Sequence, residues 1–337
     1  MRTALAFSTD DLARTRFAVS PMWEVVTSLR ALAHTPVPAL HRQWAGQVRP
    51  RLAAVGPVYR RLAAMVPPEG HLPDFLNPVP AASAPALADE LAAIAATAPA
   101  QVRADLDLLA AAHDGRLPAP LEPLYRDPAG RLPRLTADIE AYWQLALAPY
   151  WARIRALLDA DVLHRARQAV GHGTAHVLDD LHETVRWDGG ALRLEQRHCA
   201  VRRLDAGAGL LLVPSVFAWP RVLTRSLPPD PPQLAYPARG IATLWEPRPS
   251  TGSDALAAVL GRSRARLLAE LDSPASTTEL ARRTGLSAAG VSQHLTGLRA
   301  AGLTSAHRAG HAVLYARTAV ADALLAPEAA SGAGAAR

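Results

Sequence analysis

The sequence contains no lysine, a single cysteine and no long apolar run. Cys199 has no second cysteine to pair with, so the chain can form neither an intrachain disulfide nor a zinc site made of several cysteines. Its expected role is that of a small buried apolar side chain. No stretch reaches the roughly 18 uninterrupted apolar residues of a membrane-spanning helix, which argues against a membrane protein.

The N-terminus also lacks the apolar segment that an export signal needs. Charged residues stand there instead, namely Asp10, Asp11, Arg14 and Arg16. We therefore expect a cytoplasmic protein without a membrane partner.

Positive charge is carried by arginine alone and is concentrated near the C-terminus. All 36 basic residues are arginine, and the formal net charge is +6. Between Leu256 and Leu325 there are eight arginines but only four acidic residues, and no acidic residue lies between Leu280 and Ala321. A local basic excess of this kind favours contact with a polyanion, so nucleic acid is the first partner to consider.

The length of 337 residues predicts two or three folded units. Pro249 and Gly252 mark a linker over Arg248–Ser253, which separates an N-terminal domain over residues 1–248 from a C-terminal domain over residues 249–326. Residues 327–337 form an alanine- and glycine-rich tail that we expect to be disordered.

Helical and strand-like patterns both occur in the first 248 residues. The longest helical pattern runs from Thr136 to Leu181, and Pro149 should kink or divide it. Val185–Trp187 and Leu192–Leu194 flank a turn in the manner of a β-hairpin, and apolar runs near 210–217 and 233–236 add further strands. We predict an α+β fold that is mainly helical, with a small antiparallel sheet packed on the N-terminal helices.

The segment after the linker has the pattern of a helix-turn-helix. Ser276–Glu279 fits a capping box that starts one short helix, and Gly285 ends it. Ser287 is placed to cap a second helix, which Gly302 stops. Two short helices joined by a tight turn form a DNA-binding motif, whose second helix reads the major groove.

A hairpin follows the second helix. Two strand-like runs are separated by Ala309–Gly310, which is the arrangement of a wing. An arginine at its tip, Arg308, can reach backbone phosphate or a narrow minor groove, and His311 stands on the other side of the turn. The C-terminal domain is therefore expected to be a winged helix-turn-helix.

The second helix should present its outward residues to DNA. Val291, Leu295 and Leu298 form its inward stripe, and the opposite side is small or hydrogen-bonding and free of acids. His294 lies beside the stripe, so contact with phosphate and packing against the preceding helix are equally open. The candidate DNA-binding residues are Ser287, Ala288, Ala289, Ser292, Gln293, His294, Thr296, Arg299, Arg308 and His311.

The candidates have different expected roles. Ser292, Gln293 and Thr296 would touch base edges, whereas Arg299, Arg308 and one of Arg282 or Arg283 would neutralise phosphate. The alternative is a winged helix that contacts only protein, but the acid-free, arginine-bearing face argues against it.

The amino-acid sequence of this segment resembles the ArsR-type winged helix over about 70 residues. The resemblance rests on the run from Thr278 to Ser287, on Val291–Leu295, on Leu298–Leu303, and on the wing with Leu314 and Tyr315. It implies a dimeric, DNA-binding transcription regulator, usually a repressor that a ligand releases. The N-terminal region around Asp11–Arg14 and Phe17–Pro21 also resembles the long upstream region of an actinobacterial ArsR-like subgroup. That upstream region has no function that can be carried over, and the dimerisation or effector role that we expect for residues 1–248 is our own assignment.

Metal sensing through the sites of that family is not expected. The first helix of the helix-turn-helix, which precedes the recognition helix, carries Leu280, Ala281, Arg282 and Arg283. Metal sensors of the family have paired cysteines there. The C-terminal helix offers only Asp322 in place of the aspartate and histidine ligands of their second site. The effector should therefore be a small organic molecule, and no cofactor is predicted.

Outside the C-terminal domain, the most specific candidate for a functional site is a cluster of histidines. His172 and His176 are four residues apart and Asp179 follows, which is metal-ligand spacing if one helix spans them. Gly171 and Gly173 weaken such a helix, so solvated or helix-capping histidines are the favoured interpretation. His182-Glu183 begins a hydrolase-like motif but lacks its final histidine.

No catalytic constellation is recognisable, so we expect no enzyme. Phosphate-cradling loops with lysine and Gly-x-Ser-x-Gly elbows are absent from the sequence, and Gly207-Ala208-Gly209 precedes an apolar run in place of a helix. The alternative function is a small-molecule-binding protein or enzyme with an appended regulatory winged helix. An effector pocket is best sought among the aromatic residues Tyr142, Trp143, Tyr150, Trp151, Phe217, Trp219, Tyr236 and Trp245.

Overall fold

The chain forms two compact units in the computed structural model. The structure describes residues 2–6, 9–112, 115–188, 191–195, 209–227, 229–246, 253–309 and 312–326. Unit 1 comprises residues 1–143 and 154–245, and unit 2 comprises residues 144–153 and 246–337. The boundary drawn from the sequence kept residues 144–153 in the N-terminal domain, whereas the contacts of the folded chain assign them to unit 2.

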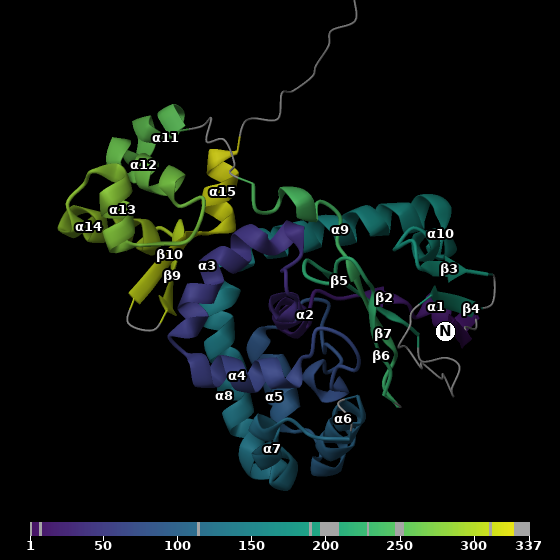
Figure 1. Ribbon diagram of the computed structural model, residues 1–337. Helices are drawn as coiled ribbons and strands as arrows, with labels where there is room; N and C mark the ends of the chain where they lie inside the picture. Colours follow the sequence, from purple (N-terminus) through teal and green to yellow (C-terminus); the bar gives the residue numbers. More distant parts are fainter. Residues whose placement is uncertain are drawn as a thin grey trace, which may run out of the picture. The chain divides into compact units, whose positions relative to one another are not determined.

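Unit 1 is built mainly from helices (Figure 1). Ser20 caps α2, where its side chain accepts a hydrogen bond from the backbone N–H of Trp23 over 3.1 Å. The helices are α1 Thr9–Ala13, α2 Pro21–Ala33, α3 Arg42–Ala53, α4 Gly56–Met65, α5 Leu87–Ala95, α6 Pro99–Ala111, α7 Glu122–Arg126, α8 Pro128–Ala146, α9 Trp151–His172 and α10 Thr174–Asp179. The last residues of α8 and the first residues of α9 belong to unit 2.

The predicted long helix is divided as proline and glycine chemistry requires. Pro149 lies in a short 3-10 turn, Ala148–Tyr150, between α8 and α9, which confirms the break. A second break lies at Gly173, whose φ of 85° ends α9 after His172 and starts α10.

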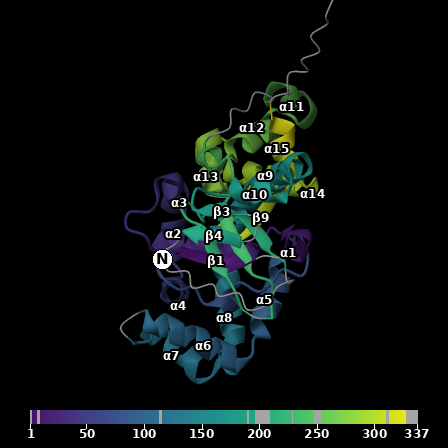
Figure 2. The same cartoon turned by 90° about the vertical axis from the view of Figure 1, so that its right-hand side faces the viewer.

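Two small sheets belong to unit 1. The predicted hairpin is confirmed as β3 Val185–Trp187 and β4 Ala191–Glu195, and β1 Arg2–Ala6 pairs with β4, so that the antiparallel order is β1-β4-β3 (Figure 2). The second sheet has the order β2-β5-β7-β6, with β2 Arg16–Phe17, β5 Leu211–Ser215, β6 Leu223–Arg225 and β7 Gln233–Pro237. It is mixed, because β2, β5 and β7 are parallel and only β6 runs antiparallel.

The second sheet is buried on both faces. Alternate residues point to opposite sides of a strand, so Leu212 and Leu234 join one apolar cluster while Leu211 and Val213 join another. The first cluster contains Val177 and Leu178 of α10 and Leu192 and Leu194 of β4, and the second contains Trp23 of α2. This double coverage explains the continuous apolar run near 210–217, which has no polar side to show to water.

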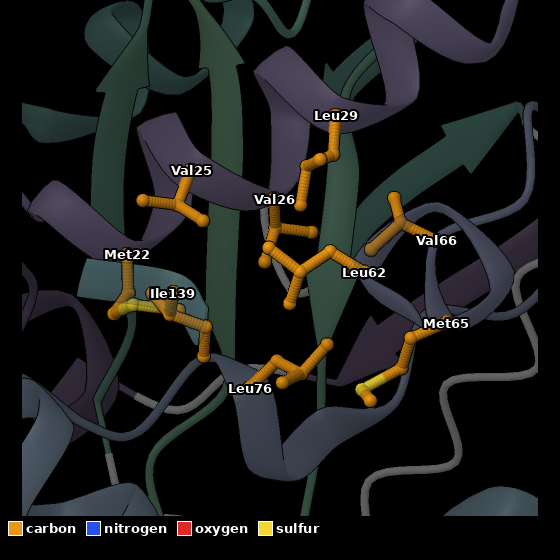
Figure 3. Close-up of a pocket in the computed structure, with 9 residues that line it drawn as sticks. All are labelled: Met22, Val25, Val26, Leu29, Leu62, Met65, Val66, Leu76 and Ile139. Atoms are coloured by element: carbon orange, nitrogen blue, oxygen red, sulfur yellow. The ribbon is translucent and has the colours of Figure 1, made fainter. Parts of the chain in front are cut away.

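A tightly packed apolar core lies between α2, α4 and α8. Figure 3 shows Met22, Val25, Val26, Leu29, Leu62, Met65, Val66, Leu76 and Ile139 around a void of about 10 Å³. A void of this size with a purely apolar lining offers no hydrogen bond to a water molecule, so it should stay dry.

Glu24 is a fully buried carboxyl group on α2. Its Oε1 accepts a hydrogen bond from the backbone N–H of Val216 over 2.9 Å. Burial raises the pKa of Glu24 to about 8, although this bond and the hydroxyl of Ser215 oppose the shift. The carboxyl group therefore holds its proton at neutral pH inside the folded unit.

Unit 2 contains a small winged helix (Figure 1). Its helices are α11 Ser253–Leu260, α12 Arg262–Glu270, α13 Thr277–Thr284, α14 Ala288–Ala300 and α15 Ala319–Leu325, and its sheet has the antiparallel order β8-β10-β9, with β8 Ala275–Ser276, β9 Thr304–Ala309 and β10 Ala312–Arg317. Val291, Leu295 and Leu298 are at most 1% exposed in its core, which confirms the inward stripe read from the sequence. Mainly helical units with small sheets and a C-terminal winged helix-turn-helix make the chain an α+β protein, as predicted.

Several sequence predictions fall on residues that the structure does not describe. They are Cys199, most of the linker at 248–253 and the tail at 327–337. In the described part of the chain, no helix has the length and apolar character needed to cross a membrane.

Candidate nucleic-acid interface

Local sequence chemistry positions α14. Gly285 ends α13 in the left-handed region with φ of 70°, a conformation that costs glycine little. Two residues later Ser287 caps α14, and its hydroxyl accepts a hydrogen bond from the backbone N–H of Gly290 over 3.1 Å. The turn between the two helices is therefore fixed by a glycine and a serine at the places where the sequence indicates them.

Only one half of the predicted capping box forms at α13. The hydroxyl of Ser276 accepts a hydrogen bond from the backbone N–H of Glu279 over 3.2 Å. The Glu279 carboxylate is ion-paired with Arg283, one turn further along the helix. Arg283 also donates to the carbonyl of Glu270 over 3.3 Å, so its side chain is committed within unit 2.

The outward residues of α14 are exposed together. The structure places Ala288, Ala289, Ser292, Gln293, Thr296 and Arg299 on the surface, while His294 is half-buried beside the apolar stripe. Ser287 is exposed as well, although its hydroxyl is already used as the cap. The Thr296 hydroxyl donates to the carbonyl of Ser292 over 2.9 Å, which leaves its oxygen as an acceptor toward a ligand.

Arginines from α13, α14 and the wing lie in the same unit as this face, and they differ in whether they are free to contact a ligand. Arg282 of α13 and Arg299 of α14 are exposed, whereas Arg283 is held by Glu279 and Glu270. Of the two alternatives left open by the sequence, Arg282 is therefore the better candidate for a phosphate contact. With Arg308 on the wing, these side chains give the surface a positive charge without an opposing acid on α14.

The wing is an antiparallel pair whose register fixes Arg308 near its tip. β9 and β10 pair from Thr304 with Arg317 to Ala309 with Ala312, and Arg308 lies opposite Val313. The Arg308 side chain is exposed. His311 lies outside the described residues. Behind the tip, His307 accepts or donates a hydrogen bond of 2.8 Å with the Ser305 hydroxyl, and burial lowers the pKa of the imidazole.

A buried arginine joins the wing to the helices. The guanidinium of Arg317, at the end of β10, lies 2.7 Å from Asp272 and 2.9 Å from Asp322 of α15. Arg153, from the 144–153 segment of unit 2, lies 3.5 Å from the Asp272 carboxylate and donates to the carbonyl oxygens of Asp272 and Glu246 over 3.0 and 3.1 Å. Sequence reasoning missed this cluster, since its members are far apart along the chain.

The histidine cluster of unit 1 is not arranged as a metal site. His172 ends α9 and His176 lies in α10, so no single helix carries both, although their ring centroids are 5.0 Å apart. The Asp179 carboxylate accepts a hydrogen bond from the backbone N–H of Trp187 over 2.6 Å. His182 bonds to the Thr184 hydroxyl and the Pro220 carbonyl over 2.8 and 3.0 Å. Among the described residues, no group of three or more histidine, cysteine or acidic side chains could hold a metal ion.

Two segments of the chain match known families. Residues 261–305 match a family described as a helix-turn-helix domain, and they contain α12, α13 and α14. Residues 98–242 match DUF5937, a family of unknown function. Comparisons with curated proteins and with solved structures gave no match. The helix-turn-helix match and the exposed face of α14 together support a DNA-binding regulator of transcription.

Proposed function

We propose that this chain is a transcription regulator of the ArsR-like winged-helix type, which binds double-stranded DNA as a homodimer and represses until a non-metal effector releases it. The outward face of α14 carries the proposal. Small and hydrogen-bonding side chains stand exposed on a helix that is anchored from inside by buried leucine and valine and capped at its first turn. Such a helix can enter the major groove without steric or electrostatic conflict.

Base readout is assigned to Ser292, Gln293 and Thr296, and phosphate contact to Arg282, Arg299 and Arg308. A glutamine can form hydrogen bonds with an adenine edge through both its carbonyl oxygen and its NH₂ group. Arginines that contact phosphate do not provide such a base contact. Phosphate contacts fix the position of the helix on the duplex but carry no sequence information directly.

Exposed apolar side chains on α11 and α15 support the dimer. Val259 of α11 is 81% exposed, and Val320 and Leu324 of α15 are 58% and 48% exposed. These two helices contact each other in unit 2. A second copy of the chain would cover such side chains, and two-fold pairing would present two reading helices to successive half-sites.

A non-metal effector is proposed because the family's metal ligands have no counterpart on α13, which carries Leu280 and Ala281 followed by two arginines. We propose a binding role for unit 1, since the sequence contains none of the catalytic motifs sought in it. The second candidate function, a small-molecule-binding protein or enzyme with a regulatory winged helix, is favoured by the arginine-lined cavity of unit 1 described below.

The test is selection of DNA fragments by the purified full-length protein from the genome that encodes it, at fixed salt. Enrichment of one palindromic site is expected from a dimeric regulator. The variant Arg126→Ala, which lacks an exposed arginine of unit 1, serves as a control and should select the same site as the wild-type protein. Equal retention of all fragments by the wild-type protein would contradict sequence-specific regulation.

A further inference from the structure

A surface-accessible cavity lies in unit 1, away from the winged helix in sequence and within one compact unit. It has a volume of about 280 Å³ and is formed by the end of α2, the following loop and the segment from Phe217 to Leu223. Its lining residues are Arg30, Ala31, His34, Pro36, Pro38, Pro68, Phe217, Ala218, Trp219, Pro220, Arg221 and Leu223. Ligand pockets in proteins span about 300 to 1,000 Å³, so the volume suits a small molecule.

Most of the wall is apolar. Phe217 is buried at 3% exposure, whereas Trp219 is 41% exposed and so presents part of its ring to solvent. Four prolines and two alanines add surfaces without hydrogen-bonding side chains. A ligand that fills this space therefore needs an apolar or aromatic body.

Two guanidinium groups give the cavity its charge. Arg30 is held in place because its Nε and Nη2 donate to the carbonyl oxygens of Pro67 and Gly70 over 3.0 and 2.8 Å. Burial lowers the pKa of Arg30 to about 10, and the neighbouring charge of Arg221 adds to the shift, so Arg30 is still a cation at neutral pH. Arg221 is 61% exposed and lies 3.1 Å from the carboxylate of Glu69.

The third polar group is a neutral one. Burial, followed by the charge of Arg30, lowers the pKa of His34 below its ordinary value of 6.5. At pH 7 the imidazole is mostly uncharged and offers a hydrogen bond in place of a third positive charge. Two cations against one carboxylate leave a net positive site, which an anion would complete.

We infer that this cavity binds a small organic carboxylate with an apolar or aromatic body, and that this class of molecule is the effector. The carboxylate would lie between Arg30 and Arg221, where it competes with Glu69 for the second arginine. The body of the ligand would lie against Phe217 and Trp219. The binding site stands on unit 1 alone, whereas its role as an effector site rests on the proposed function.

An aromatic cluster leads from the cavity wall to the end of unit 1. The Phe217 ring lies 4.5 Å from Trp44 and 6.1 Å from Trp245, and the two tryptophan rings are stacked with centroids 6.3 Å apart. Trp245 is the last residue of unit 1, and the next residue, Glu246, accepts a hydrogen bond from Arg153 within unit 2. A ligand that shifts Phe217 would therefore move the point at which the chain passes into unit 2.

The test is isothermal titration calorimetry of the full-length protein with benzoate, salicylate and hexanoate. Benzamide and inorganic phosphate separate the contributions of the charge and of the apolar body. At least one carboxylate should bind with one molecule per chain, and benzamide and phosphate should bind more weakly. Absence of binding by all three carboxylates would overturn the site, and equal binding of benzoate and benzamide would overturn the role of the arginines.

Variants locate the site. Arg221→Gln should raise the Kd roughly 5- to 10-fold, a moderate loss because the guanidinium is largely exposed. Arg126→Gln is the matched control, since Arg126 is an exposed arginine paired with Glu122 over 2.6 Å elsewhere in unit 1. His34→Trp should fill the cavity from its rim and abolish binding while circular dichroism stays unchanged. An unaltered Kd in both Arg221→Gln and His34→Trp would place any binding elsewhere.

The effector role has its own readout. In the presence of a bound carboxylate, the affinity of the wild-type protein for its selected DNA site should fall, whereas that of Arg221→Gln should fall less at the same concentration. Ligand binding without any change in DNA affinity would overturn the effector role and leave the site intact. Failure of the wild-type protein to select DNA without ligand would instead count against the proposed function.

Discussion

The carboxylate of Asp272 lies 2.7 Å from the guanidinium of Arg317, whose side chain is only 4% exposed. This contact ties the last strand of the wing to the loop before the helix-turn-helix. Asp272→Asn should lower the free energy of unfolding of unit 2, because it leaves the buried Arg317 with Asp322 as its remaining carboxylate partner. We expect a loss of about 1 to 3 kcal/mol, less than the roughly 3 to 5 kcal/mol typical of breaking a fully buried pair.

Urea unfolding followed by circular dichroism measures this loss. The control is Glu279→Gln, which breaks the more exposed pair with Arg283 and should cost less than about 1 kcal/mol. Equal effects of the two substitutions would show that the Asp272 pair contributes no more than a surface pair.

Gln293→Ala and Arg308→Ala should alter DNA binding in different ways. Loss of a bidentate base contact costs about 1 to 3 kcal/mol at one base pair, so Gln293→Ala should relax the preference there. Arg308→Ala should weaken binding to every sequence and reduce the slope of log K against log salt by about 0.9. Fluorescence anisotropy with the selected site and single-base variants, at several salt concentrations, measures both. A uniform loss on all sequences for both variants would contradict these roles.

Ser287→Ala should loosen the first turn of α14. The hydroxyl satisfies the backbone N–H of Gly290, and loss of such a cap costs about 1 kcal/mol. Hydrogen exchange should therefore show faster opening of the N-terminal amides of α14. Thr278→Ala is the control, because Thr278 is exposed in the first turn of α13 and is not its cap. If both variants exchange like the wild type, the cap does not stabilise the helix.

Glu24→Gln should make unit 1 more stable at alkaline pH. An unfolded glutamate ionises near 4.5, whereas the folded one keeps its proton up to a pKa of about 8. As pH rises through this window the unfolded state binds fewer protons than the folded state, so wild-type stability falls. The glutamine keeps the acceptor for the Val216 N–H but does not titrate.

The stability difference between Glu24→Gln and the wild type should therefore grow between pH 4.5 and pH 8. A tenfold change in the proton affinity of the carboxyl group on folding corresponds to about 1.4 kcal/mol, which makes the expected gain a few kcal/mol. The measurement is the urea midpoint of each protein at about pH 5 and at about pH 9, two values that bracket most of this pH range. Glu122→Gln, on the surface of α7, should shift both midpoints alike. A difference that stays constant with pH would contradict a buried protonated Glu24.

Val320→Asp should weaken the dimer without unfolding unit 2. Val320 is exposed in the first turn of α15, where a negative charge is tolerated by the helix. If a second copy covers this residue, burial of an unpaired carboxylate should raise the dimer Kd at least roughly 10-fold. Sedimentation equilibrium measures this change. Leu108→Asp, on an exposed position of α6, should leave the dimer intact, and equal dissociation in both variants would argue against an interface at α15.

The helix-turn-helix could be predicted from the sequence because its signals are local. Gly285 and Ser287 act on the adjacent backbone, and the Val291 stripe repeats within a few turns of one helix. The break at Pro149 and the β3–β4 hairpin were accessible for the same reason. The parallel pairing of β2 with β5 was not, since it joins Arg16 to Leu211 across nearly two hundred residues.

The charged part of the cavity lining could not be predicted from the sequence, for a related reason. Phe217 and Trp219 belong to the aromatic region in which a pocket was expected, but Arg30 lies far from them in sequence and carries no motif. Its position beside them depends on the packing of α2 against the mixed sheet. Nor could the sequence show that Asp272 is shared by Arg153 and Arg317, because ion pairing between distant residues follows from the tertiary fold.

Residues 144–153 belong to unit 2 although the rest of that unit starts at residue 246, and this order affects synthesis of the chain. A ribosome adds roughly 5 to 20 residues per second, so Arg153 is made several seconds before Asp272 and Arg317. Unit 1 can collapse around its own core during that interval, but unit 2 can close only after its last strand has left the exit tunnel. The nascent chain thus completes unit 1, with its cavity, before its helix-turn-helix domain, so under the proposed function it would be able to bind an effector before it could bind an operator.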